Sequence, residues 1–401
     1  MKSINSINFK DTEIGPIPET WNLLDFDEAV DFNPKRTIKK GQNTKFVEMA
    51  NVQSFNKNVL AYAERIFSGG TKFKNGDTIM ARITPCLENG KTAYINFLDQ
   101  DEVAAGSTEF IVLSGKEGVT ISDFVYYLAI SPSIRSAAIT AMTGTSGRQR
   151  VENDKLASYQ LAVPSLEEQK QIAEILSSLD DKIELNRKIS ANLEKMASAL
   201  FKKWFVDIGD ELPEGWRMGK LGEEFEIIMG QSPSGDTYNE LGQGIPFYQG
   251  RTDFGSRFPI RRVYCTDPQR KAMAFDTLIS VRAPVGDVNM ATEECCIGRG
   301  VGAIRKNGFS CYTFYMIKAL QSEIAEFDSE GTIFGSINKN SLANISCVVP
   351  PKNIIVEFEK KATDIDSQIL NLSKEMQNLT SIRDSLLPRL MSGKLRVLYG
   401  K

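Results

Sequence analysis

The 401-residue sequence contains no histidine, and this absence excludes whole classes of chemistry. Catalytic systems in which an imidazole activates a serine or cysteine nucleophile lose their base. Zinc hydrolases of the HExxH type, and zinc sites with mixed cysteine and histidine ligands, lose a metal ligand. None of these sites can be assembled from this chain alone.

The sequence also lacks paired cysteines and long apolar runs. Its six cysteines form no C-x-x-C pair, which excludes a zinc ribbon, and we expect free thiols that are mostly buried. No apolar run approaches about 18 residues, so no membrane span is expected. Residues 1–13 lack the apolar core of a signal peptide, and the sequence therefore predicts a cytoplasmic protein.

Neither charge nor composition is extreme. With 41% hydrophobic and 25% charged residues, the sequence is typical of a folded protein, and its length predicts two or three domains. The net charge of -3 gives no support for nucleic-acid binding by the chain as a whole. A nucleic-acid interface would therefore have to be a local basic patch.

An internal repeat organises the chain. Residues 18–21 (PETW) return as residues 213–216 (PEGW), and residues 77–85 (DTIMARITP) return, with one insertion, as residues 276–284 (DTLISVRAP). These units are far longer than the repeats of solenoid proteins. We therefore interpret the chain as two tandem copies of a globular domain that is followed by a long helix.

Each globular part is predicted to be α+β, because short strand-like segments alternate with Asn-Gly turns. A helix is expected around residues 123–139. The predicted division of the chain is a first globular domain at 1–163, a first long helix at 164–206, a second globular domain at 207–350, and a second long helix with a C-terminal tail at 351–401.

Both long helices carry apolar residues at the a and d positions of a heptad, which is the pattern of a coiled coil. Two ordinary amphipathic helices are the alternative; we favour a coiled coil because the seam persists over several heptads in both copies. Paired within one chain, the helices would run antiparallel with pseudo-two-fold symmetry. The predicted seam residues are Ile172, Leu176, Leu179, Ile183, Asn186, Leu193 and Leu200 in the first helix and Phe358, Ile365, Ile369, Leu372, Met376, Leu379 and Leu386 in the second.

The ends of the helices carry recognisable signals. Ser165 is expected to be the N-cap of the first helix, with Glu168 reaching back to it. Pro388 is expected to end or kink the second helix, with a stop at Gly393. The seam of the first helix spans roughly 43 Å at about 1.5 Å per residue. This is a little more than one turn of B-DNA, about 34–36 Å, so such a rod could hold two domains over separated half-sites.

Two segments of the sequence partly resemble phosphate-binding motifs, but neither fits its motif completely. Residues 89–92 (NGKT) end like a P-loop, but Pro85 stands where the first glycine should be. Residues 298–303 (GRGVGA) fit the glycine pattern of dinucleotide-binding folds, but Asn307 and Gly308 break the helix that must follow. We interpret the second motif as a tight turn between strands.

Local basic stretches are more informative. They lie at residues 33–47, 144–150 and 251–271, and arginine suits paired contacts with guanine edges and phosphates. A solubilising loop would explain a single patch better, but one patch in each copy favours nucleic-acid binding. Arg82 and Arg282 are equivalent in the two copies, and so are expected to position phosphate or the fold rather than to distinguish sequences. The predicted DNA-binding residues are Lys35, Arg36, Lys39, Lys40, Arg82, Lys91, Arg148, Arg150, Arg251, Arg257, Arg261, Arg262 and Arg282.

Over essentially its full length the chain resembles the specificity subunit of type I restriction-modification enzymes. The most specific matching stretch is residues 166–176 (LEEQKQIAEIL), followed by residues 179–183 (LDDKI) and 201–205 (FKKWF). Residues 353–357 (NIIVE) depart from the LEEQ start in the second copy. The other matching stretches are residues 18–21, 77–85, 88–91 (ENGK) and 106–110 (GSTEF).

This resemblance implies recognition without catalysis. In that family two target recognition domains each read half of a split DNA site, and an antiparallel coiled coil spaces them. Methyltransferase subunits, expected to be two, and restriction-translocase subunits would bring S-adenosylmethionine, ATP and Mg2+; no cofactor or metal is expected in this chain. Phe201, Trp204 and Phe205 are candidates for docking a partner, with packing against the adjacent domain as the alternative.

Two other functions stay compatible with the sequence. One is a coiled-coil scaffold whose domains bind proteins and have no DNA specificity. The other is a nuclease or methyltransferase in its own right, which incubation of the lone chain with DNA, Mg2+ and S-adenosylmethionine would reveal.

Overall fold

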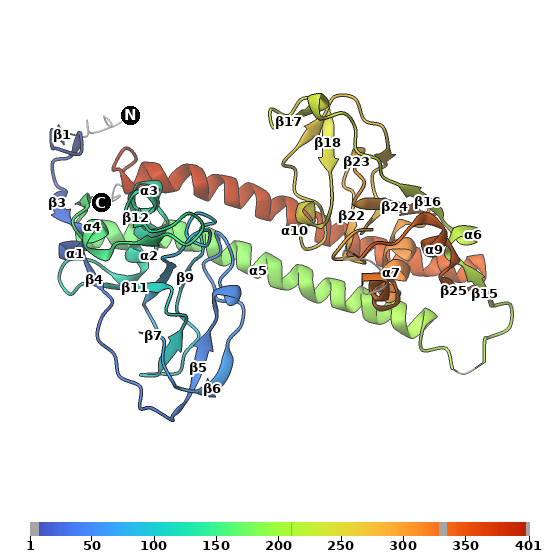
Figure 1. Ribbon diagram of the computed structural model, residues 1–401, viewed down its shortest axis with the longest axis horizontal. Helices are drawn as coiled ribbons and strands as arrows, with labels where there is room; N and C mark the ends of the chain where they lie inside the picture. The colour runs from blue at the N-terminus through green and yellow to red at the C-terminus, as the bar shows by residue number, and fades with distance from the viewer. Residues whose placement is uncertain (1–7, 210, 329–334, 398–401) are drawn as a thin grey trace, which may run out of the picture. The chain divides into compact units, whose positions relative to one another are not determined.

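The computed structural model describes residues 8–209, 211–328 and 335–397. Contacts divide the chain into two compact units, one formed by residues 1–185 with 375–401 and the other by residues 186–374. Each unit holds one globular domain together with one segment of each long helix, α5 (Leu166–Phe205) and α10 (Lys352–Met391) (Figure 1). The expected α+β class with two tandem domains and two long helices is confirmed.

The first domain is built from short strands and short helices. Its strands are β1 (Phe9–Lys10), β2 (Ile17–Pro18), β3 (Asn22–Asp25), β4 (Val30–Phe32), β5 (Asn43–Val47), β6 (Ala63–Ile66), β7 (Thr71–Lys74), β8 (Thr78–Ala81), β9 (Thr92–Tyr94), β10 (Val103–Gly106), β11 (Phe110–Gly115), β12 (Met142–Thr143), β13 (Arg150–Val151) and β14 (Gln160–Val163). Its helices are α1 (Phe26–Ala29), η1 (Met49–Asn51), α2 (Ser122–Ile130), α3 (Pro132–Thr140) and α4 (Asn153–Ala157).

The second domain is likewise built from short strands and short helices. Its strands are β15 (Arg217–Lys220), β16 (Glu226–Met229), β17 (Tyr238–Asn239), β18 (Ile245–Tyr248), β19 (Tyr264–Cys265), β20 (Lys271–Ala272), β21 (Thr277–Ser280), β22 (Val288–Met290), β23 (Cys295–Ile297), β24 (Val301–Arg305) and β25 (Ser346–Val349). Its helices are α6 (Leu221–Glu224), η2 (Gly235–Thr237), η3 (Arg251–Asp253), α7 (Ser310–Ala319), α8 (Gln321–Ala325), η4 (Glu326–Asp328) and α9 (Lys339–Asn344).

The two domains share one sheet topology, which confirms the internal repeat. The order β4-β11-β8-β9 in the first domain matches β16-β24-β21-β22 in the second. The order β6-β5-β10-β7 matches β19-β18-β23-β20, to which the second domain adds β17. A parallel pair lies at the same place in both, β5 with β10 and β18 with β23. The last strand of each copy pairs with its first long strand, β14 with β3 and β25 with β15.

The central strands are buried on both faces, which explains their continuous apolar sequence. In β8, Ile79 packs into the core between the two sheets and Met80 into the core shared with the helices. In β21, Leu278 and Ile279 divide between two cores in the same alternation. Because side chains alternate along each strand, this layer of strands joins the core shared with the helices to the core of the second sheet.

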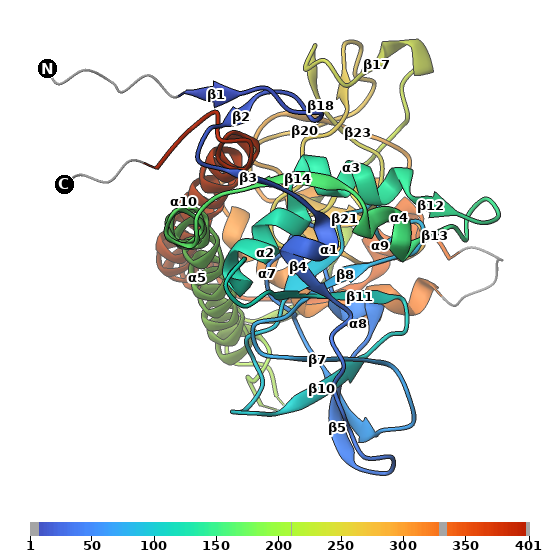
Figure 2. The same cartoon turned by 90° about the vertical axis from the view of Figure 1, so that its left-hand side faces the viewer.

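The two long helices pair in antiparallel fashion within each unit, as the seam predicts. In the first unit Ile172 and Leu176 of α5 share a core with Leu387 and Leu390 near the end of α10. In the second unit the later part of α5 packs on the earlier part of α10. Every predicted seam residue is buried or half-buried, and Asn186 is fully buried. Figure 2 shows the two helices nearly end-on, lying side by side.

The helix ends differ from expectation in three places. Ser165 Oγ accepts a hydrogen bond from Glu168 N at 3.4 Å, as predicted, but the Glu168 carboxylate accepts from Trp21 Nε1 at 3.0 Å instead of reaching back. Pro388 does not end α10, which continues to Met391. The helix expected around residues 123–139 is broken into α2 and α3, because Ser131 takes an extended conformation before a proline and caps α3.

The cysteines agree with the expectation of free, mostly buried thiols. All six cysteines are free; Cys86 is half-buried and the others are buried. Burial raises the pKa of Cys347 to about 11, so this thiol stays protonated and unreactive near neutral pH. Among the described residues, no helix combines the length and the apolarity that crossing a membrane requires.

Gly393 holds the C-terminal segment against the first domain. Its φ is +69°, and an added Cβ would lie 2.9 Å from Pro18 Cδ and 3.4 Å from the Trp21 ring. Replacing Gly393 with alanine is therefore expected to lower the free energy of unfolding by about 2–3 kcal/mol, from backbone strain and overpacking together. Urea denaturation of the full chain measures this.

Gly118 supplies the matched control, because its φ is +75° but a Cβ there would have open space. Gly118→Ala should therefore cost only the backbone term, about 1 kcal/mol. If both variants lose the same free energy of unfolding, the close approach of residue 393 to Pro18 adds nothing to the cost of the Gly393→Ala substitution.

Candidate nucleic-acid interface

In the second domain, the ends of several strands meet at one loop edge. Gly298 N donates to Tyr248 O at 2.8 Å, and Val281 N donates to Gly300 O at 3.0 Å. The residue after β16 donates its N–H to the first residue of β24 at 2.9 Å. These bonds tie the ends of β16, β18 and β21 to the turn between β23 and β24. We call this the loop edge of the domain.

The first domain has the same loop edge. Ser107 N donates to Val47 O at 3.1 Å, and Arg82 N donates to Glu109 O at 2.9 Å. These are the same two backbone bonds, made at equivalent places by β5, β8 and the turn between β10 and β11. Arg82 therefore corresponds to Val281, so the predicted equivalence of Arg82 and Arg282 is wrong. The backbone of the loop edge is thus shared by the two copies, while its side chains differ.

Three predicted residues of the first domain lie together at its loop edge. Arg150 donates to the Glu109 carboxylate from Nε at 3.0 Å and from Nη2 at 2.7 Å, which raises the pKa of Arg150. Arg82 is half-buried and donates from Nη2 to Val151 O at 2.9 Å. Arg148 is exposed in the loop before β13. Arg148 and Arg150 can therefore reach a ligand, whereas Arg82 mainly ties β13 to the edge.

The basic loop between β4 and β5 divides into exposed and structural residues. Lys35, Lys39 and Lys40 are exposed. Arg36 was predicted to bind DNA, but its side chain is not available for this. It is 11% exposed and binds the buried Asp77 carboxylate through two hydrogen bonds of 2.8 and 2.5 Å. A buried carboxylate requires such a partner, so Arg36 belongs to the fold.

The second domain supports this correction. Its equivalent aspartate, Asp276, is held by Arg305 through bonds of 2.9 and 2.5 Å. The two copies thus keep the buried aspartate and take the arginine from different places. Lys91 is a second correction: its side chain is half-buried and donates to Met49 O at 2.9 Å, so it fixes η1.

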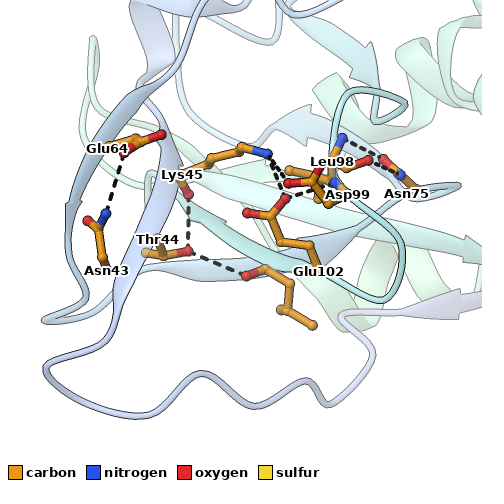
Figure 3. A network of polar contacts seen from close by, with 9 residues as sticks. Asn43, Thr44, Lys45, Glu64, Asn75, Leu98, Asp99 and Glu102 are labelled. Atoms are coloured by element: carbon orange, nitrogen blue, oxygen red, sulfur yellow. Dashed lines mark hydrogen bonds and ion pairs between the residues drawn. The ribbon is translucent and has the colours of Figure 1, made fainter.

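Lys45, in the same basic stretch, is also held by acids of its own domain. Figure 3 shows its side chain directed at Glu102 and Asp99, which it contacts at 2.7 and 3.1 Å. The hydrogen bonds to Glu102 and then Asp99 raise the pKa of Lys45. The positive charge that remains on this stretch is therefore concentrated on Lys35, Lys39 and Lys40.

Three arginines of the second basic stretch are exposed but paired with acids. Arg251 Nε lies 2.6 Å from Asp287 Oδ2, and Arg261 Nε lies 2.5 Å from Glu293 Oε1. Arg262 Nη2 lies 2.8 Å from Asp253 Oδ1. The Asp253 side chain is only 2% exposed, and its other oxygen accepts from backbone N–H groups at the end of β18. Arg262 therefore helps to fix the loop, and the stretch is less basic than its sequence indicates.

Arg257 was predicted to contact DNA, and the structure contradicts this. Arg257 is only 3% exposed. Its guanidinium carbon lies 3.3 Å from the centre of the Phe314 ring, and Nη2 lies 2.5 Å from Asp366 Oδ2 on α10. The planar, weakly hydrated guanidinium suits stacking and a buried ion pair. Arg257 fastens the β18–β19 loop to the helix.

The aromatic residues predicted to dock a partner are packed inside the second unit. Phe201 and Phe205 are each 2% exposed and lie 5.4 and 5.2 Å from Phe358, ring centre to ring centre. Trp204 is half-buried and lies 6.2 Å from the same ring. Packing against the adjacent domain, the alternative interpretation, is thus what the structure shows, and the docking prediction is wrong for the two phenylalanines.

Some exposed cations were missed by the sequence analysis. Among the described residues, Arg270, Arg282 and Arg299 of the second domain are exposed and have no carboxylate partner; of these, only Arg282 was predicted. Arg270 lies beside the loop edge, because Ile297 N donates to its carbonyl at 3.0 Å. Arg299 lies in the turn itself, and its signal in the sequence was the pair of glycines that flanks it.

Comparison with known proteins identifies both copies. The family model for the type I restriction modification DNA specificity domain matches residues 18–195 and again residues 213–380. Both matches contain a globular domain and much of the helix that follows it. The repeat deduced from the sequence therefore corresponds to two copies of one known domain.

Relatives of similar length match nearly the whole chain. The chain is 30% identical to the putative type I restriction enzyme MjaX specificity subunit of Methanocaldococcus jannaschii, over 97% of both chains. It is 26% identical to the type I restriction enzyme HindI specificity subunit of Haemophilus influenzae, over 80% of this chain and 87% of that one. A crystal structure of a type I restriction-modification S subunit from M. genitalium has the same fold, with a TM-score of 0.55, 19% identity and 98% of both chains covered.

Proposed function

Because this chain belongs to the family of type I restriction modification DNA specificity domains, we propose that each of its two domains reads one half of a split DNA site through its loop edge. The chain is then the DNA-recognition subunit of a type I restriction-modification complex. The observation that carries the proposal is the loop edge itself, in which two equivalent backbone hydrogen bonds recur in both domains while the side chains differ.

A shared backbone with different side chains is what split recognition requires. Equivalent backbones place equivalent strand ends against DNA, and contacts to base edges then supply the sequence difference. At equivalent positions of the turn, the first domain has Thr108 and the second has Arg299, both exposed. Two domains with identical loop edges would read the same sequence twice.

Affinity would come from the exposed cations that remain after the structural ones are set aside. In the first domain these include Lys35, Lys39, Lys40 and Arg148. Contacts of this kind with phosphate displace counterions and make binding weaken with salt. The exposed ion pairs at Arg251 and Arg261 contribute little to stability, so these arginines are free to exchange their carboxylates for phosphate.

The antiparallel helix pair would set the number of unspecified base pairs between the half-sites. Its buried seam, including Asn186, supports a fixed register, since a polar seam residue favours one pairing over others. In this proposal the chain itself is not catalytic. Methyltransferase subunits would bring S-adenosylmethionine, and restriction subunits would bring ATP and Mg2+.

Selection of bound or methylated duplexes from a random library tests the proposal, with the chain assembled with its modification subunits. We expect one motif with two specified segments, separated by a fixed number of unspecified base pairs. A single continuous site would contradict the assignment of one half-site to each domain. Absence of any DNA preference in the complete complex would favour a protein-binding scaffold, and DNA modification by the lone chain would favour an enzyme.

A further inference from the structure

The turn that carries Arg299 is built so that its backbone lies directly on β18. A Cβ added to Gly298 would lie 3.1 Å from the Phe247 ring, and one added to Gly300 would lie 3.3 Å from Gly250 Cα and closer still to Gln249 O. Glycine on both sides therefore allows this close approach. Arg299 is the one residue of the turn with a side chain, and it is exposed on a fixed support.

The guanidinium of Arg299 is held by one nitrogen only. Nε donates to Ser232 Oγ at 3.3 Å, and the backbone N of Arg299 donates to the same oxygen at 3.3 Å. Among the described residues no carboxylate pairs with it, in contrast to Arg251 and Arg261, which each use Nε to bind an acid. The two terminal nitrogens of Arg299 therefore remain available as a parallel pair of donors.

Two exposed amides flank this arginine. Gln249 directly follows β18, and its carbonyl accepts from Gly300 N at 3.1 Å. Gln231 lies two residues after β16, and its N–H donates to Ile297 O at 3.0 Å. Both side chains are exposed. Their backbones are bonded to one turn, and an amide side chain can both donate to and accept from a base edge, which suits these residues to base recognition.

The first domain lacks this arrangement at the equivalent place. Thr108 stands where Arg299 stands, and Glu48 stands where Gln249 stands; the Glu48 carboxylate binds Arg65 at 2.8 Å. The difference lies on the backbone that the two domains share. These side-chain differences therefore change what the two loop edges can bind, while the shared backbone bonds are kept.

We infer that Arg299 reads a guanine in the half-site of the second domain, by donating both terminal guanidinium nitrogens to O6 and N7 of that base. This inference rests on the proposed function. A bidentate pair of this kind is the commonest specific contact in the major groove. Gln249 and Gln231 are placed to contact the neighbouring base pairs.

The test uses the complete complex with its modification subunits and S-adenosylmethionine. Duplexes randomised in both half-sites are methylated and sequenced with the wild-type chain and with Arg299→Ala. We expect one guanine position in one half-site to lose discrimination by about 5- to 150-fold, equivalent to about 1–3 kcal/mol. All other positions, including the whole of the other half-site, should be unchanged.

Two further variants separate base reading from charge and from folding. Arg299→Lys keeps the charge but loses the planar pair of donors, and should fall between the wild type and the alanine variant. Lys220→Ala removes an exposed cation from the end of β15, outside the loop edge, and should leave the motif unaltered. Thermal unfolding of all three variants should match the wild type, because both side chains are exposed.

Three results would overturn the inference while leaving the proposed function intact. The first is that Arg299→Ala leaves both the motif and the methylation rate unchanged. The second is that Arg299→Ala relaxes the motif in both half-sites. The third is a uniformly lower methylation rate with an unchanged motif, and this result would make Arg299 a phosphate contact. Failure of the proposed function looks different, because the wild-type complex would then yield no split motif at all.

Discussion

Replacing Arg257 with leucine is expected to destabilise the second unit by about 3–5 kcal/mol, because it leaves the Asp366 carboxylate, only 11% exposed, without its charged partner. Arg257 Nη2 lies 2.5 Å from the Asp366 carboxylate, and the arginine is almost fully buried. Tyr315 Oη also donates to Asp366 at 2.8 Å, but one neutral donor cannot replace the lost charge. Urea denaturation of the full chain, followed by fluorescence, measures the loss.

Arg261→Ala is the matched control, since it removes an arginine from the same basic stretch and an ion pair that is exposed on both sides. We expect a change below about 1 kcal/mol. The double variant Arg257→Leu with Asp366→Leu should recover part of the lost stability, because the unpaired charge is gone. A stable Arg257→Leu chain whose methylated motif is relaxed would restore the sequence-based interpretation of Arg257 as a DNA-reading residue.

Arg257 has a counterpart in the first domain that no alignment of the two copies indicates. Lys57 O accepts from Tyr94 N at 2.8 Å, just as Arg257 O accepts from Met290 N at 3.0 Å. Lys57 is also buried, and its Nζ donates to Tyr127 Oη at 3.3 Å. In both domains, a buried cation from the same long loop thus reaches aromatic residues that are bonded to an aspartate of a long helix. The loop edge is fastened to its helix by this contact.

The sequence predicted what depends on periodicity and repetition. Heptad spacing located both helices and their seam, and the repeat located two equivalent domains. The sequence alone could not separate structural arginines from arginines that read DNA, because the partners of the structural arginines lie far away along the chain. Asp366 lies 109 residues from Arg257, and Asp77 lies 41 residues from Arg36.

The same limit explains the residue that was missed. Arg299 was noticed only as part of a glycine pattern, which we interpreted as a tight turn, and the structure confirms the turn. What the glycines permit is a close approach to β18, a segment about fifty residues earlier. A local motif shows where a backbone is unusual, whereas the reason for it appears only once the neighbouring strand is in place.

The second large effect is expected at Arg383, which joins the two helices within the first unit. Arg383 Nη1 lies 2.7 Å from Asp180 Oδ1, and both residues are 6% exposed. Tyr127 Oη donates to the other Asp180 oxygen at 2.8 Å. Burial opposes the charge on Arg383, but the carboxylates of Asp180 and Asp384 outweigh it and raise the pKa of Arg383, so the guanidinium stays charged. Burial and Asp180 also raise the pKa of Tyr127, which keeps its hydroxyl a donor.

Arg383→Met should therefore lower the free energy of unfolding of the first unit by about 3–5 kcal/mol, since methionine fills the space but leaves Asp180 without a counter-charge. Lys182→Ala provides the control on the same pair of helices, because Lys182 and Glu375 are 3.5 Å apart and nearly half exposed; it should cost less than about 1 kcal/mol. Similar small losses in both variants would mean that the apolar seam alone holds the helices together. A large loss at Arg383 only would mean that the buried pair of Arg383 and Asp180 holds the two helices together in the first unit, in addition to the apolar seam.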